Sequence, residues 1–234
     1  MEATPPAHSD RREGLQKAAE MVIASLPVVG GALQIAFQDA MGRSLIERRE
    51  RWLTELAEAV NDLRDKIGDY SDAAKNAAFV DAVVTATQIA DRTSRTEKRK
   101  LLRNAVLNAA LPDSPDEDLQ QLFFDLVDRL TPTHIQLLMV LADPPGWFDR
   151  TGLTRPRFAL SSNRPALIEA AMPQFAGRRD LIERYYGALQ NNSLVIAPLG
   201  GMMTENAAFQ PITSELGREF LTFIEDPRKP APSD

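Results

Sequence analysis

Cysteine and histidine, which often carry out chemistry, are scarce in this chain of 234 residues. Asp and Glu are plentiful, but the sequence does not show two of them facing each other in a cleft. It has no cysteine, and therefore no thiol nucleophile and no thiolate ligand for a metal. Its two histidines are His8, in a polar N-terminal stretch, and His134, in the first turn of an expected helix. A zinc site would need several carboxylates beside them, and no spacing in the sequence arranges such a set. We therefore expect no catalytic residue, no metal and no cofactor.

Motifs that bind nucleotides or activate a serine are also missing from the sequence. The glycine pairs Gly30-Gly31 and Gly200-Gly201 match neither the phosphate loop nor the dinucleotide fingerprint. The chain has no Gly-x-Ser-x-Gly elbow either. An enzyme is therefore the least favoured class, and we expect no small-molecule substrate.

A basic cluster follows Ser94-Arg95-Thr96-Glu97, which predicts a capping box that opens a helix through about Ala110. Most such clusters are solvated or pair with nearby acids, here Asp113, Asp116 and Asp118. The alternative is contact with a phosphate or a lipid headgroup. The candidate contact residues are Arg95, Lys98, Arg99, Lys100 and Arg103. No aromatic residue is interleaved, so a single-stranded nucleic-acid platform is not indicated.

A second group of arginines lies on an expected helix at 179–190, in the position of a recognition helix. Its candidate DNA contacts are Arg178, Arg179 and Arg184. Asp180 and Glu183 lie among them, and residues 132–234 hold ten Arg or Lys against eleven Asp or Glu. Because DNA-binding domains usually carry a basic footprint, we place protein interaction ahead of DNA binding.

An uncharged stretch from Met21 to Phe37 is interrupted by proline and glycine, which predicts two short apolar helices around a kink. It lies at the lower limit of the about 20 apolar residues that a membrane span needs. A buried hairpin in the bundle core is the first interpretation, and a conditional membrane-active segment is the second. The residues of that candidate segment are Leu26, Pro27, Val28, Val29, Gly30, Gly31, Leu33 and Phe37.

Further helices are expected at 43–68, 72–91 and 114–130. In the first, Ile46, Leu53, Val60 and Ile67 recur every seven residues, and Leu56 and Leu63 are interleaved at heptad spacing. This pattern predicts a seam for a partner helix, either inside a bundle or between molecules. In the third, Ser114 is the expected N-cap. Proline disfavours helical geometry in the preceding residue, so this helix should stop before Thr131-Pro132, where Thr131 caps the next helix.

The C-terminal part contains the only β signal. Ser193–Leu199 and Ala208–Ile212 are expected to pair as strands, between a helix at 179–190 and a last helix that Thr213 caps. The expected order is three helices, at 132–142, 164–175 and 179–190, then a two-stranded β-ribbon and a last helix. This is the order of elements in a winged helix. The predicted fold is mainly α: a helical bundle at 13–131, then a winged-helix-like domain at 132–225 with a two-stranded β-ribbon. Residues 1–12 and 226–234 are expected to be disordered.

The whole pattern resembles bacterial abortive-infection alpha-type proteins over most of residues 18–224. The similarity is carried by Leu26–Phe37, the charged helix from Arg43, Glu97-Lys98-Arg99, Leu130-Thr131-Pro132-Thr133-His134 and Ile212–Phe220. The chain departs from that pattern in having no clear membrane span and a long loop after Asp143. The resemblance implies a role in bacterial defence against phage and carries no catalytic residues.

Charge and composition narrow the functional classes further. The net charge of −6 disfavours attraction of the whole protein to nucleic acid or anionic lipid. The lack of cysteine fits a reducing compartment, and we expect a cytoplasmic protein that can lie at the membrane periphery.

The leading hypothesis is a non-enzymatic bacterial defence or toxin-type protein whose bundle acts on a membrane or a protein partner, with a C-terminal sensing or regulatory module. The alternatives are a winged-helix DNA-binding regulator and an adaptor that self-associates.

Overall fold

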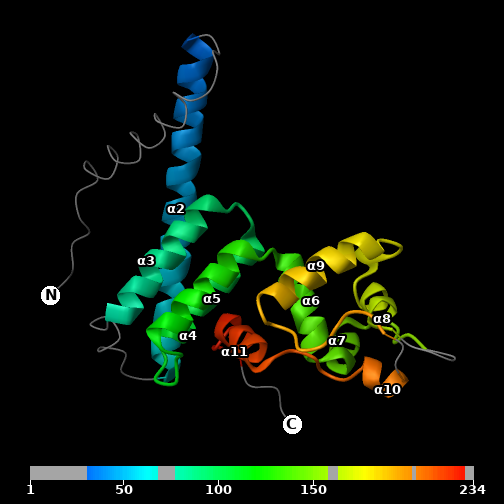
Figure 1. Ribbon diagram of the computed structural model, residues 1–234. Coiled ribbons are helices and arrows are strands. Elements are labelled where there is room, and N and C mark those ends of the chain that lie inside the picture. Colours follow the sequence, from blue (N-terminus) through cyan, green and yellow to red (C-terminus); the bar gives the residue numbers. More distant parts are fainter. Residues whose placement is uncertain (1–30, 68–76, 158–162, 202–203, 230–234) are drawn as a thin grey trace.

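The computed structural model describes residues 31–67, 77–157, 163–201 and 204–229. Helices α2 to α5 lie together with the last helix, α11, and helices α6 to α10 form a second group beside them (Figure 1). The elements are α2 (Gly31–Ile67), α3 (Ala77–Arg92), α4 (Thr96–Ala109), α5 (Glu117–Arg129), α6 (Pro132–Ala142), α7 (Pro144–Thr151), α8 (Arg164–Ala171), the 3-10 helix η2 (Pro173–Phe175), α9 (Arg179–Asn191), α10 (Glu205–Ala208) and α11 (Glu215–Ile224).

Helix α2 is a continuous helix of 37 residues. Its buried row is Trp52, Leu56, Ala59 and Leu63. Leu56 and Leu63 of the predicted seam are buried and Val60 packs against the core, whereas Leu53 of the same seam is 38% exposed. The helices that cover this side of α2 are α3 and α4 of the same molecule. No helix in the described residues is long and apolar enough to cross a membrane.

Two expected capping boxes do not form. Helix α4 begins at Thr96, one residue later than a Ser94 cap requires, and its N-cap Arg95 makes no side-chain cap bond. The hydroxyl of Thr93 accepts the Arg95 N–H at 3.2 Å, which orders the preceding turn in another way. Helix α5 begins at Glu117 rather than after Ser114, because the Asp116 carboxylate accepts the Leu119 N–H at 2.9 Å. An ionised acceptor makes a stronger cap bond than a hydroxyl.

The expected break between α5 and α6 is confirmed. Helix α5 ends at Arg129, and Thr131 is the N-cap of α6. The Thr131 N–H donates to Nδ1 of His134 at 3.1 Å, so the histidine closes the cap. Burial, and then the charge of Arg184, lower the pKa of His134, which keeps that nitrogen free to accept. His134 therefore has a structural partner.

The prediction of a long loop after Asp143 is wrong for the first part of that stretch, because residues Pro144–Thr151 form α7. The Asp143 carboxylate caps this helix by accepting the Gly146 N–H at 2.9 Å, and two prolines occupy its first positions. Proline is well tolerated there, because its missing N–H would have had no helical partner. Trp147 donates its ring N–H to the Ala171 carbonyl at 3.0 Å and joins α7 to α8.

The prediction of a β-ribbon is wrong. The winged-helix assignment is therefore wrong as well, because it requires that ribbon. The described residues contain one isolated antiparallel bridge, between Val195 and Thr213, and no strand. Pro198 and Pro211 have no N–H to donate to a ladder. The N–H of Ile212 is also taken, because it donates to the Leu141 carbonyl at 3.0 Å. The two segments meet around that bridge, where the Ile196 N–H donates to the Ile212 carbonyl oxygen at 2.9 Å, and the prolines and α6 prevent a longer ladder.

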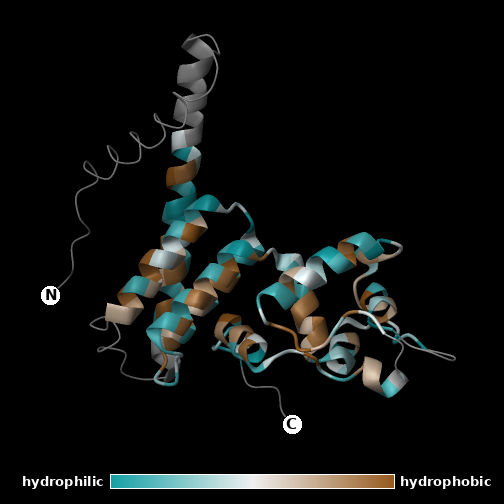
Figure 2. Cartoon of the chain, in the orientation of Figure 1, coloured by the Kyte–Doolittle hydropathy of each residue, from teal (hydrophilic) through white to brown (hydrophobic). Residues whose placement is uncertain are grey.

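The last helix completes the core of the first group of helices. Helix α11 packs on α4, and the rings of Phe220 and Phe223 lie 5.6 and 5.3 Å from the ring of Phe123 on α5. Apolar and polar residues are interspersed along these helices (Figure 2), and the buried apolar residues belong to one core cluster. A segment expected to close the C-terminal module therefore packs against the N-terminal helices.

Candidate binding surfaces

A surface groove of about 570 Å³ separates the end of α4 and the following loop from α11. Leu111, Leu119 and Phe223 supply its apolar lining. We call it the α4–α11 groove. Its position follows from the packing of α11 on α4, and none of its residues was among the sequence-based candidates.

Four carboxylates line the same groove: Asp113, Asp116, Glu215 and Glu219. Asp116 and Glu215 have a local role, since acids stabilise the positive N-terminal ends of α5 and α11. Glu219 lies one turn after Glu215, and like charges at this spacing repel each other. None of the four forms an ion pair within the described residues. The groove therefore carries a net negative charge, since four carboxylates face the one arginine of its lining, Arg218.

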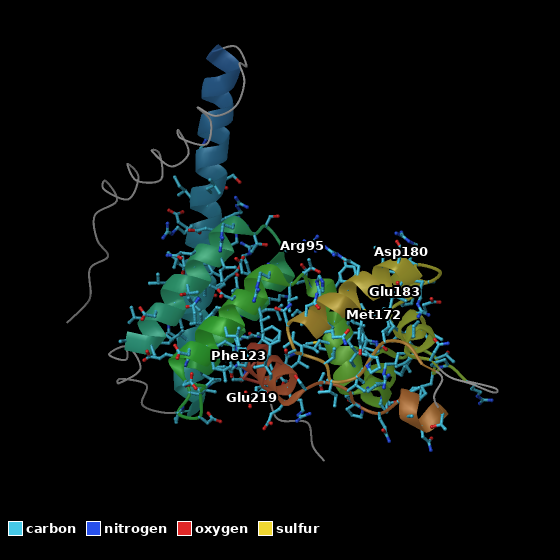
Figure 3. All side chains as sticks on the ribbon, viewed as in Figure 1. Arg95, Phe123, Met172, Asp180, Glu183 and Glu219 are labelled. Carbon is cyan, nitrogen blue, oxygen red and sulfur yellow. The ribbon has the colours of Figure 1, made fainter. Side chains whose placement is uncertain are left out.

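The single cation in the groove lining is already engaged. Nη1 of Arg218 donates to the Thr213 carbonyl oxygen at 3.2 Å. Glu219 lies on α11 as labelled in Figure 3. Its carboxylate is exposed and has no hydrogen bond to another described residue. It is thus the acid best placed to meet a cation from outside the molecule.

Two asparagines of α4 fix the wall of the groove that α11 forms. Nδ2 of Asn108 lies 2.7 Å from the Phe223 carbonyl oxygen and 2.8 Å from that of Glu225. Nδ2 of Asn104 donates to the Ile224 carbonyl oxygen at 3.0 Å. The last carbonyls of a helix lack partners within the helix, and these amides supply them. Polar residues on an apolar helix face are the sequence signal that could have identified this contact.

Beyond α11, an ion pair holds the chain close to α2. The guanidinium of Arg228 donates to both oxygens of Asp226, at 2.8 and 2.9 Å, and lies 3.4 Å from Asp62. These hydrogen bonds are the main reason that the pKa of Asp226 falls to about 2. This segment was expected to be disordered from residue 226, and residues 226–229 are instead described and bonded.

This ion pair predicts a loss of stability in acid. The folded pKa of Asp226, about 2, lies below the ordinary value of 3.8, so the pair stabilises the fold above pH 3.8. That contribution should disappear as pH falls from about 4 to about 2. Solvent screening reduces it to about 1 kcal/mol. Urea unfolding of wild type and Asp226→Asn should differ by this amount at pH 6 and should converge near pH 2. A constant difference would contradict the assignment.

The predicted basic cluster on α4 is divided by the fold. Lys98 donates to the Asp128 carbonyl oxygen, and Arg92 pairs with the Asp128 carboxylate at 2.9 Å. Asp128, rather than the expected Asp113, Asp116 or Asp118, is therefore the acid that meets this cluster. Arg95 and Lys100 are exposed, whereas Arg103 is half-buried and Arg99 is buried.

The arginines of the expected recognition helix are largely neutralised on α9 itself. Arg178 pairs with Asp180 at 2.9 Å, and Arg179 pairs with Glu183 at 3.0 Å. Both acids lie along the exposed side of α9 (Figure 3). Arg184 is exposed as well. Without the ribbon and with two of three arginines paired, α9 has little free charge for DNA phosphates.

The candidate membrane-active segment lies almost wholly outside the described residues. This applies to Leu26, Pro27, Val28, Val29 and Gly30. Gly31, Leu33 and Phe37 belong to the first turns of α2, whose side chains are not described. The described residues also contain no group of three or more His, Asp or Glu side chains placed to hold a metal ion.

Comparison with models of known protein families, with curated proteins and with solved structures finds no match for this chain.

Proposed function

We propose that this chain is a non-enzymatic binding protein that docks a basic segment of a partner protein in the α4–α11 groove. The observation that carries the proposal is the set of four unpaired carboxylates around an apolar lining. The resemblance of the helix pattern to abortive-infection proteins supports a role in bacterial defence. In that role the docked segment would belong to the protein that triggers or receives the response.

The chemistry of the groove specifies the kind of segment that fits. An amphipathic helix binds a groove by placing apolar residues at positions i, i+3, i+4 and i+7 against the lining. Lysine or arginine beside these residues would meet Asp113, Asp116, Glu215 and Glu219 at the rim. Charges at a rim mainly set association rate and partner choice, and the apolar contact supplies most of the affinity. The partner segment should therefore be both basic and rich in leucine or similar residues.

A labelled amphipathic peptide of leucine and lysine tests this docking by fluorescence anisotropy. Glu219→Lys should raise the Kd about tenfold at low salt, because it reverses one rim charge. The difference should shrink at high salt, where screening shortens the reach of exposed charges. The measured quantity is the Kd ratio between variant and wild type at each salt concentration.

Glu58→Lys is the matched control, since Glu58 is exposed on α2 and the substitution changes the net charge equally. A leucine and glutamate peptide is the control probe. If Glu58→Lys weakens binding as much as Glu219→Lys does, attraction to the whole protein explains the result and the groove is not the site. Equal binding of both peptides by wild type would also refute the proposal.

A further inference from the structure

The buried arginine of α4 has no ion-pair partner among the described residues. Arg99 is 7% exposed, and its Nε and Nη1 are buried without a hydrogen-bond acceptor in that part of the chain. A buried charge that is left unpaired is strongly unfavourable by comparison with a paired one. Buried guanidinium groups normally meet a carboxylate, a carbonyl or a phosphate. The missing acceptor is an observation that points to a ligand.

The N-terminal end of α4 is open at the same place. Its N-cap Arg95 offers no side-chain acceptor, and the Arg99 N–H is the first to bond within the helix, to the Arg95 carbonyl at 3.2 Å. The N–H groups of Thr96, Glu97 and Lys98 have no acceptor among the described residues. An uncapped helix start concentrates positive charge and unpaired donors, and both favour an anion.

The surrounding charges are mostly positive. Arg95 is exposed at the turn between α3 and α4 (Figure 3) and makes no ion pair within the described residues. Arg92 pairs with the Asp128 carboxylate, and Lys98 donates to the backbone carbonyl oxygen of the same residue. Glu97 is the opposing charge in the first turn, and it is exposed. Helical side chains lean toward the helix N-terminus, which is the direction of the free amides from Arg99.

We propose that the start of α4 binds a phosphate group, with Arg99 as the buried anchor and Arg95 and the free amides of residues 96–98 as further donors. A phosphate supplies several acceptor oxygens in a volume that a guanidinium and a helix start can share. This site lies on the opposite end of α4 from the α4–α11 groove and does not depend on docking there. The same phosphate chemistry could come from a free phosphate compound or from a lipid headgroup.

The test compares thermal unfolding of wild type and Arg99→Met with and without inorganic phosphate. Phosphate at about ten times its Kd should raise the wild-type Tm by about 4 °C. Arg99→Met should raise the Tm of the unliganded protein, because it removes an unpaired buried charge, and should abolish the response to phosphate. Arg184→Met, the same change at an exposed residue of α9, should alter neither quantity.

A second arm identifies the source of the phosphate by sedimentation with vesicles. If the ligand is a headgroup, phosphatidylglycerol vesicles should carry down wild type but not Arg99→Met, and phosphatidylcholine vesicles should carry down neither. If Arg99→Met does not fold, Arg95→Gln replaces it, and it should weaken binding about fivefold because Arg95 is an exposed donor. Absence of any response to phosphate and to vesicles, or an equal response of wild type and the variants, would overturn the site.

Discussion

Gly217→Ala should lower the free energy of unfolding by about 3 kcal/mol. Gly217 lies in the first turn of α11, where an added Cβ would meet the Leu194 carbonyl oxygen at 2.4 Å and its carbon at 3.2 Å. Both atoms belong to the backbone, and the Ser214 N–H donates to the same oxygen at 3.0 Å. The helix start therefore cannot move away without losing that bond. Urea unfolding followed by circular dichroism measures the difference.

The same substitution at Gly187 should have the opposite effect. Gly187 lies inside α9, and an added Cβ there meets no atom within 4 Å. Alanine restricts the unfolded chain and favours the helix, so Gly187→Ala should stabilise the protein by about 0.5–1 kcal/mol. The pair of variants separates close packing from general helix propensity. A stable Gly217→Ala protein would show that the contact with Leu194 is not tight.

Asn108→Asp should destabilise the fold by about 4 kcal/mol at neutral pH. Nδ2 of Asn108 donates toward carbonyl oxygens of Thr222, Phe223 and Glu225 at 3.3, 2.7 and 2.8 Å. A carboxylate would remove the donor and place negative charge against those oxygens. Burial and this repulsion should raise the folded pKa of the new carboxyl above its unfolded value. The destabilisation should therefore be smallest in acid and should grow as pH rises.

Two further variants define the cause. Asn108→Ala loses the hydrogen bonds without adding charge, so it should cost about 2 kcal/mol and show no added pH dependence. Asn206→Asp, at an exposed position, should change stability by about 0.5 kcal/mol or less. Guanidinium unfolding between pH 5 and 8 gives the three values. If Asn108→Asp and Asn206→Asp behave alike, the α4 amide does not hold α11.

Local sequence signals predicted most of the helices, α7 and α10 excepted, but not their partners. The break at Thr131-Pro132 followed from proline sterics, which act within a few residues. Helix α5 begins two residues later than predicted, because Asp116 rather than Ser114 is its N-cap. Both residue types are good N-caps, so the sequence alone does not decide between them. The ribbon does not form because the apolar, β-rich stretch Ser193–Leu199 and its expected partner each contain a proline that cannot donate to a ladder.

Neither binding surface could be read from the sequence, for the same physical reason. The α4–α11 groove needs residues 111–119 and 215–223 side by side, and no local pattern brings them together. The basic cluster was visible, but the burial of Arg99 depends on the packing of α4 in the bundle. The spacing of residues in the sequence indicates which of them share a helix face. Tertiary packing determines which of those residues are buried.

The bonds from Asn104 and Asn108 to the end of α11 join positions 114 to 120 residues apart. During synthesis α2 to α5 leave the ribosome long before α11, so the parts of Phe123 and Phe124 that Phe223 covers stay exposed for that interval. Contacts this distant in sequence close slowly, because a long loop must first be ordered. A nascent chain of this protein should therefore spend much of its translation time as a client for chaperones that shield aromatic surface.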